Sequence, residues 1–198
     1  TDKATYSKTG TLSNALSFSA GDVLNFNATV GNRDVKEEEK VVYTLVTNVA
    51  NLAVGDKVVI VAAGYDVAMS TNQKTNNRGQ VAVTKSGNTI AYVDDLQILT
   101  LEAGTKTGTF AFNTGSGYLY AASSSDNNLK TQATNNDNGS WSITIADGTA
   151  TIKAQGTNTR NVMQYNQSSS LFACYSSASQ KPLSIYKGVE ADTDGLTA

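Results

Sequence analysis

The sequence predicts an all-β protein, and two observations lead to this fold class. Thr, Ser and Asn together account for 63 of the 198 residues, and Thr favours strands whereas Asn and Ser favour turns. Short apolar runs of strand length also alternate with polar turns along the chain. No window carries an uninterrupted helical pattern of apolar residues. We therefore expect short strands, many polar turns and almost no helix.

The first 40 residues predict a short β-hairpin segment followed by a charged linker. Residues 12–18 and 24–30 alternate apolar and polar positions around the turn Ala20-Gly21-Asp22. Two strands alone bury too little surface to be stable, so this segment must pair with something or end a preceding domain. The charged run 36–40 is typical of a solvated linker. We divide the chain into this segment (1–40), a main module (41–187) and a flexible tail (188–198).

A weak repeat with a period of about 45 residues organises the main module. Each copy has a strand, a Gly or Asn turn, a second strand, a long polar loop and a closing strand. The predicted strands lie at 41–46, 58–62, 67–70, 96–101, 109–112, 118–121, 141–145, 150–154, 161–165, 171–175 and 183–186, with long loops at 71–79 and 123–139. Each unit is too small to form a core of its own, and closing the three units into one barrel pairs the strand edges that would otherwise be exposed. The period therefore predicts a pseudo-threefold β-trefoil-like barrel, with a β-sandwich as the alternative.

Several classes of function are excluded by what the chain lacks. It contains no histidine, which removes His-based acid–base chemistry and His-ligated metals. Its single cysteine, Cys174, excludes an internal disulfide and a Cys-cluster metal site. The net charge is −2 with no long Lys/Arg cluster, which argues against nucleic acid as a partner. No apolar run is long enough to span a membrane, and we predict no cofactor and no enzyme activity.

Ordered motif strings in residues 41–187 resemble a known kind of module. They include Tyr43-Thr44-Leu45-Val46, Gly117-Tyr118-Leu119-Tyr120-Ala121-Ala122, Trp141-Ser142-Ile143, Arg160-Asn161-Val162-Met163-Gln164-Tyr165-Asn166 and Lys181-Pro182-Leu183-Ser184-Ile185-Tyr186-Lys187. The chain is similar here to a β-module that recurs in large multidomain secreted or surface proteins of gut anaerobic bacteria. The resemblance carries no catalytic signature. It implies an extracellular or cell-surface location and an accessory role in attachment to glycans or surfaces.

Tyrosines flanked by amides are the candidate binding residues. Sugar rings present apolar C–H faces, so carbohydrate sites combine an aromatic platform with Asn, Gln or Asp side chains. The candidate ligand-binding residues are Tyr120, Asn127, Asn128, Lys130, Asn161, Gln164, Tyr165 and Asn166. Trp141 begins an alternating strand and is interpreted as core. For Tyr118 and Tyr120, which share one strand face, core packing is also favoured over exposure.

Three other features are interpreted as structural. The run 135–139 groups oxygen ligands before a glycine but lacks the register and the acid of a calcium loop, so a polar turn is favoured and no metal is predicted. Asp94 and Asp95 are adjacent and would face opposite ways in a strand, so they favour a turn over a catalytic pair with Glu102. Cys174 lies in an apolar run and is interpreted as a buried thiol.

The sequence thus predicts a non-catalytic accessory module that binds glycan or surface polysaccharide. The alternative is a structural subunit of a surface fibre or adhesin that assembles through residues 1–35. In that case the alternating N-terminal strands would pair across a subunit boundary.

Overall fold

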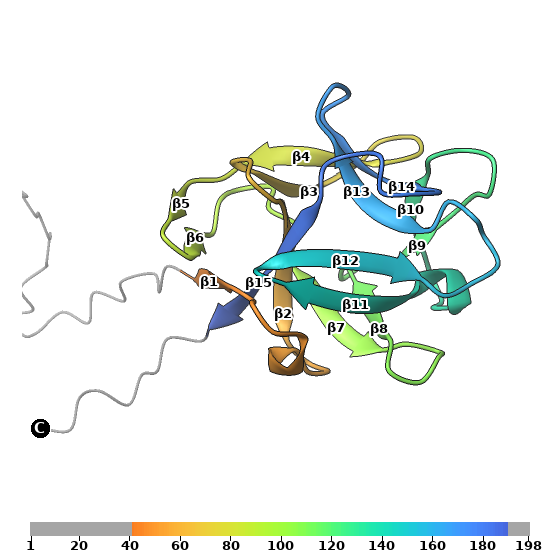
Figure 1. The fold of residues 1–198 in the computed structure, drawn as a ribbon, viewed down its shortest axis with the longest axis horizontal. Coiled ribbons are helices and arrows are strands. Elements are labelled where there is room, and N and C mark those ends of the chain that lie inside the picture. The colour runs from red at the N-terminus through yellow and green to blue at the C-terminus, as the bar shows by residue number, and fades with distance from the viewer. Residues whose placement is uncertain (1–40, 190–198) are drawn as a thin grey trace, which may run out of the picture. The chain divides into compact units, whose positions relative to one another are not determined.

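The computed structural model describes residues 41–189. The predicted hairpin segment, the charged linker and the tail beyond Val189 lie outside the described residues. The described part is all-β, with fifteen strands and two short 3-10 helices (Figure 1). In chain order these are β1 (Val42–Leu45), η1 (Val49–Asn51), β2 (Lys57–Ala62), β3 (Val67–Gln73), β4 (Arg78–Ala82), β5 (Lys85–Ser86), β6 (Thr89–Ala91), β7 (Leu99–Ala103), β8 (Phe110–Asn113), β9 (Tyr118–Ala121), β10 (Leu129–Gln132), η2 (Asp137–Gly139), β11 (Ser140–Ala146), β12 (Thr149–Ala154), β13 (Val162–Asn166), β14 (Leu171–Tyr175) and β15 (Leu183–Val189).

Six strands pair in an antiparallel ring. The order is β2, β7, β8, β11, β12 and β15, and β15 pairs back onto β2. The ring is uneven: β11 and β12 pair over six residues each, whereas β12 and β15 meet only at Ala150 and Leu183. All described strands belong to one connected sheet, which confirms the all-β class.

The interior of the ring is the main core. Trp141, Phe112 and Leu101 are fully buried there, and the Trp141 and Phe112 rings lie 6.1 Å apart. This confirms that Trp141 is a core residue. Its indole Nε1 donates to the Leu119 carbonyl at 3.2 Å, which satisfies the only polar atom of a buried indole.

Strand β2 is buried on both faces, which explains its continuous apolar sequence. Val58, Ile60 and Ala62 face the main core. Val59 and Val61 face a second cluster with Tyr43 of β1 and Ile90 of β6, among others. A strand covered on both sides needs apolar residues at every position. Strands β1, β5 and β6 therefore form an outer layer over this side of the ring.

Three hairpins extend from the ring: β3–β4, β9–β10 and β13–β14. The long loops expected at 71–79 and 123–139 are shorter than predicted. Strand β3 continues to Gln73 and β4 begins at Arg78, while β10 and η2 occupy part of the second loop. The β5–β6 hairpin, which turns at Gly87 with φ +58°, was also not predicted.

Candidate functional site

The β9–β10 hairpin has an open outer face. Leu119 and Ala121 of β9 are fully buried, whereas the alternating Tyr118 and Tyr120 remain partly exposed. Side chains alternate between the two faces of a strand, so both tyrosines lie on the outer face, about 7 Å apart along the strand. Lys130 of β10 pairs directly with Tyr120. The structure thus brings Tyr120 and Lys130, two predicted site residues, onto one surface.

The other two hairpins offer no comparable face. Strands β3 and β4 contain no aromatic residue, and segment 94–98 runs antiparallel beside β3, where the Gln97 and Thr71 amides donate to the Met69 and Asp95 carbonyls. On β13–β14, Met163, Gln164 and Tyr165 are buried in succession, as are residues 172–175. Among the three hairpins of the described residues, β9–β10 therefore offers the accessible aromatic face.

A fixed carboxylate borders this face. Glu102 of β7 accepts hydrogen bonds from Asn113 Nδ2 at 2.6 Å and from the Tyr118 hydroxyl at 2.8 Å. These bonds, first that from Asn113 and then that from Tyr118, lower the pKa of Glu102 below its ordinary value. The same bond raises the pKa of the Tyr118 phenol. Glu102 is thus held ionised as an acceptor beside the tyrosines.

A cluster of polar loop residues adjoins the end of the hairpin. Arg160 Nη1 donates to Asn127 Oδ1 at 2.7 Å, which joins the β9–β10 loop to the segment before β13. Asn158 Nδ2 donates to the Ala121 carbonyl at 2.7 Å and ties the same two segments. Asn128 and Asn161 are both partly exposed within these segments. The segments that carry Asn127, Asn128 and Asn161 are thereby tied to one another.

Tyr165 and Gln164 do not fit the predicted role. Tyr165 is 3% exposed; its ring packs against Tyr65 and Phe172 with centroids 5.9 and 5.1 Å away, and its hydroxyl donates to Gln80. Gln164 is 4% exposed, and its amide holds the loop after β14 through Ser177 and Gln180. Buried side chains cannot stack on a sugar, so both are structural.

Asn166 stabilises the β13–β14 turn. Its Oδ1 accepts from the Ser168 hydroxyl at 2.8 Å and the Ser169 amide at 3.1 Å, and its Nδ2 donates to the Tyr175 hydroxyl at 2.9 Å. These bonds occupy the amide within its own hairpin, so Asn166 belongs to the turn rather than to the open face.

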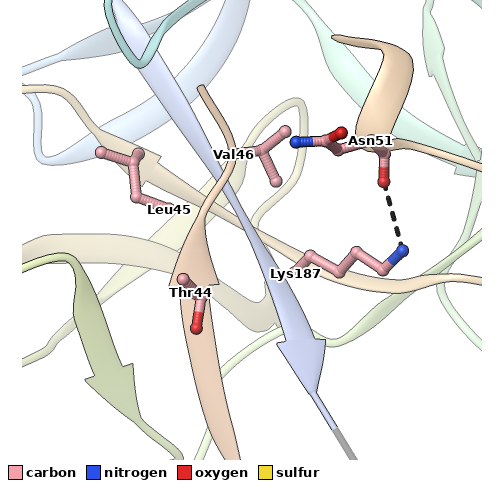
Figure 2. A pocket seen from close by; sticks show the side chains of 5 residues that line it. All are labelled: Thr44, Leu45, Val46, Asn51 and Lys187. Carbon is pink, nitrogen blue, oxygen red and sulfur yellow. Dashed lines mark hydrogen bonds between the residues drawn. The ribbon is translucent and has the colours of Figure 1, made fainter. Parts of the chain in front are cut away.

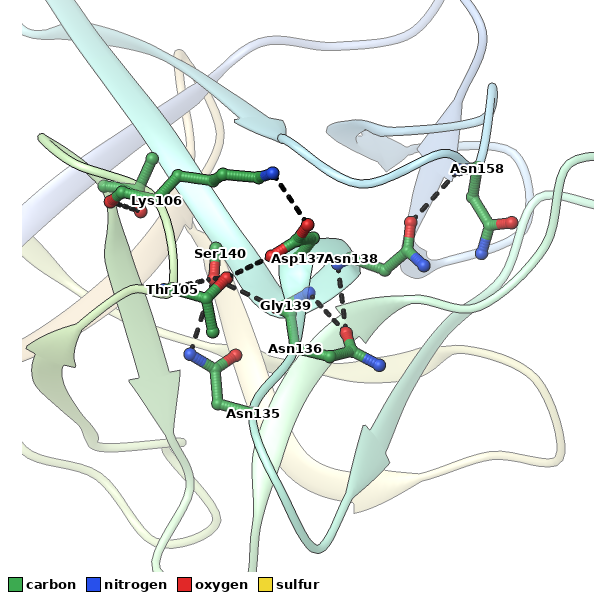
Figure 3. Close-up of polar contacts among 10 residues, drawn as sticks. Thr105, Lys106, Asn135, Asn136, Asp137, Asn138, Gly139, Ser140 and Asn158 are labelled. Atoms are coloured by element: carbon green, nitrogen blue, oxygen red, sulfur yellow. Dashed lines mark hydrogen bonds and ion pairs between the residues drawn. The ribbon is translucent and has the colours of Figure 1, made fainter.

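The polar run before β11 is a capped turn (Figure 3). Asn136 Oδ1 accepts from the Asn138 and Gly139 amides and caps η2. Asp137 forms an ion pair with Lys106 at 2.8 Å and accepts from the Thr105 hydroxyl, and both contacts lower its pKa, Lys106 more than Thr105. The preferred interpretation as a polar turn is confirmed.

Asp94 and Asp95 also occupy a turn, and Asp95 has φ +63°. Cys174 is fully buried, and burial raises the pKa of its thiol far above the ordinary value. Neither feature contributes to an accessible site.

A small cavity of about 140 Å³ lies away from the predicted residues (Figure 2). It is lined by Thr44, Leu45, Val46, Asn51 and Lys187. The Lys187 ammonium is already bound by Asp56 at 2.9 Å and by the Asn51 carbonyl at 3.2 Å. The described helices include none long and apolar enough to cross a membrane.

Sequence reasoning missed Tyr118, Glu102 and Asn113. The alternation of Tyr118 and Tyr120 with Leu119 and Ala121 was the available signal, because a core face and an open face alternate in this way. Glu102 and Asn113 lie on other strands, and their approach to Tyr118 depends on the pairing of β7, β8 and β9.

Comparison with known proteins gives a distant likeness. No protein-family model matches the chain, and no curated protein matches it. Among solved structures, the chain is similar to one described as the crystal structure of lysenin pore, with 16% identity and a TM-score of 0.46. The match covers 70% of this chain and 50% of that one, so the chain spans about half the length of that structure.

Proposed function

We propose that the chain is a non-catalytic module that binds glycans through the outer face of β9–β10. The observation that supports this most is the pair Tyr118 and Tyr120, partly exposed on one face and bordered by an ionised Glu102. Aromatic faces pack on the C–H faces of sugars, and carboxylate and amide groups bind their hydroxyls. Tyr120, Lys130, Asn127, Asn128 and Asn161 remain in the proposed site from the sequence prediction.

We further propose that the fold is a pseudo-threefold β-trefoil. The proposal is supported by the six-strand ring and by the three hairpins, which follow β2, β8 and β12 at similar places in the predicted repeat. In a trefoil, β1, β5 and β6 would be extra strands added to the first of the three repeats, the one that begins with β2. The accessory role in a secreted or cell-surface protein, with adhesion as its outcome, is proposed from the sequence resemblance alone.

A glycan array followed by titration tests the binding proposal. The Tyr120→Ala variant should lose binding to whatever glycan the wild type selects, by about tenfold or more, because it removes one stacking platform. Tyr92→Ala is the matched control, since Tyr92 is 43% exposed but lies after β6. Absence of binding to every glycan at millimolar concentration, or equal binding by Tyr120→Ala, would overturn the proposal.

Assembly through residues 1–35 stays a prediction, because those residues lie outside the described ones. Light scattering on the full chain and on a chain beginning at Val41 tests it. Oligomers of the full chain that disappear on truncation would support assembly. Monomers in both samples would overturn the assembly prediction.

A further inference from the structure

We propose that the glycan bound by this module is anionic, with a carboxylate or sulfate group seated between Lys130 and Arg160. This inference rests on the glycan-binding function proposed above. It adds the chemical class of the ligand and the way in which the ligand is oriented on the hairpin.

Lys130 and Arg160 are among the cations of the described part that form no ion pair. Lys85, Lys106 and Lys187 each form an ion pair with an aspartate. No ion pair within residues 41–189 includes Lys130 or Arg160. Asp126 is adjacent to Asn127, but its carboxylate accepts from the Ser125 hydroxyl at 3.0 Å instead.

The segments that carry the two cations meet beside the aromatic face. Lys130 pairs with Tyr120 across the hairpin, and Arg160 is bound to Asn127, three residues before Lys130. Three residues span at most about 11 Å of chain. The Arg160 guanidinium is held at Asn127, and the flexible Lys130 side chain is expected to extend toward it so that both bind one acid group.

Asn127 prepares Arg160 for such a ligand. The bond to Asn127 Oδ1 uses one N–H of Nη1. Arg160 Nε is buried without a partner among the described residues, so the donors left for a ligand are those of Nη2 and the second N–H of Nη1. A planar guanidinium held at one corner keeps further donors for a carboxylate or sulfate. Arg160 itself is partly exposed, so these donors are not all enclosed.

Glu102 sets the direction of the ligand. Its carboxylate is fixed at the Tyr118 end of the face, where it would repel an acid group and accept bonds from hydroxyls. The acid group is therefore expected at the Tyr120 end, beside Lys130. This polarity distinguishes the site from a uniformly basic surface that binds any polyanion.

Calorimetric titration with matched acidic and neutral probes tests the inference. The first pair is tetragalacturonate and its methyl ester, and the second is N-acetylglucosamine 6-sulfate and N-acetylglucosamine. The acidic member of at least one pair should bind about tenfold more tightly, and added salt should weaken it. Comparison of the two pairs tells a carboxylate from a sulfate ligand.

Lys130→Gln and Arg160→Gln should each remove most of that preference, measured as the ratio of the acidic-probe affinity to the neutral-probe affinity of the same variant. Lys85→Gln is the control for loss of one positive charge, because Lys85 lies in the outer layer on β5. Thermal melts establish that each variant is folded. If Arg160→Gln does not fold, the Lys130→Gln variant still tests the inference, because Lys130 lies on the outer face of the hairpin.

Equal affinity for acidic and neutral probes, or a preference that survives Lys130→Gln, would overturn the inference and leave glycan binding intact. Failure of the acidic probes to bind at all would also overturn it. In that case the array decides separately whether any neutral glycan binds.

Discussion

The Tyr118 hydroxyl of β9 donates a hydrogen bond of 2.8 Å to Glu102 Oε2 of β7, sixteen residues earlier in the chain. The bond ties the base of the β9–β10 hairpin to the ring of strands, and it fixes a negative charge beside the open tyrosine face. Since Asn113 of β8 binds the other carboxylate oxygen at 2.6 Å, three consecutive strands meet at this one side chain.

Replacing Tyr118 by Phe should raise the pKa of Glu102 towards its ordinary value. The hydroxyl stabilises the ionised carboxylate, and its loss leaves the Asn113 bond alone. The pKa should remain below the ordinary value because Asn113 contributes the larger effect. Carbon-detected NMR titration of the Glu102 carboxyl group measures the change.

The sign of the pH dependence follows from the same shift. A lowered native pKa stabilises the fold at higher pH, and this stabilisation is lost as pH falls through the native pKa. Tyr118→Phe should therefore lose less stability on acidification than the wild type. The control variant Tyr92→Phe should leave the pKa of Glu102 at its wild-type value. The same pKa in Tyr118→Phe and in the wild type would show that the Tyr118 hydroxyl does not stabilise the Glu102 carboxylate.

Gly117→Ala should lower the free energy of unfolding by roughly 2–4 kcal/mol. Gly117 has φ +145°, and an added Cβ would come within 2.5 Å of the Gln132 carbonyl oxygen on the neighbouring strand. Gly115→Ala is the matched control, because Gly115 has φ +88° with nothing near its Cβ, and it should cost about 1 kcal/mol. Equal losses in urea unfolding would show that the contact with Gln132 is unimportant.

Arg78→Ala should lower the free energy of unfolding by about 3 kcal/mol. Arg78 is 3% exposed, and its guanidinium donates to the Ser70 carbonyl at 3.0 Å and to the Gln97 side chain. Truncation leaves these acceptors unpaired and opens a void. Arg78→Met should cost less, because an apolar side chain of similar length fills the space.

Chemical denaturation of both Arg78 variants and of Lys153→Ala checks this prediction. Lys153 is exposed on β12, and its replacement should change stability by less than about 0.5 kcal/mol. A loss for Arg78→Ala no greater than that for Lys153→Ala would show that the Arg78 contacts do not hold β3, β4 and segment 94–98 together.

The single Trp141 should report the integrity of the ring. Its side chain is fully buried and donates to the Leu119 carbonyl, so its fluorescence should resist acrylamide quenching until global unfolding. Trp141→Phe should cost about 2 kcal/mol through the lost bond and the smaller ring. Ready quenching in the native state would contradict the core position.

Local pattern predicted much of the fold. We could infer the apolar run of β2, the alternation of β9 and the core position of Trp141, because burial of one or both faces of a strand sets the order of its apolar and polar residues. Strand β10 was missed because Lys130, Thr131 and Gln132 form no apolar alternation, and it exists through its pairing with β9. Hairpin β5–β6 was missed since its few residues show little pattern of their own.

The site was predicted less completely, for a related reason. Tyr165 was expected to be exposed, yet Tyr65 and Gln80, 100 and 85 residues earlier in the chain, cover it. Tyr118 was interpreted as core, although only the alternate residues of β9 face inward. The exposure of a side chain depends on which distant segments pack over its strand, and the sequence pattern of the strand itself does not specify those segments.

NMR shift mapping on the ¹⁵N-labelled full chain tests most directly whether glycan binds the β9–β10 hairpin. A glycan selected from the array is added, and the backbone amide shifts are followed to saturation. If glycan binds the outer face of β9–β10, the largest changes should fall in 118–120 and 127–132, with smaller ones near Arg160 and none around Tyr92. Changes centred on the Leu45–Lys187 cavity, or no changes at saturating glycan, would contradict binding at this face.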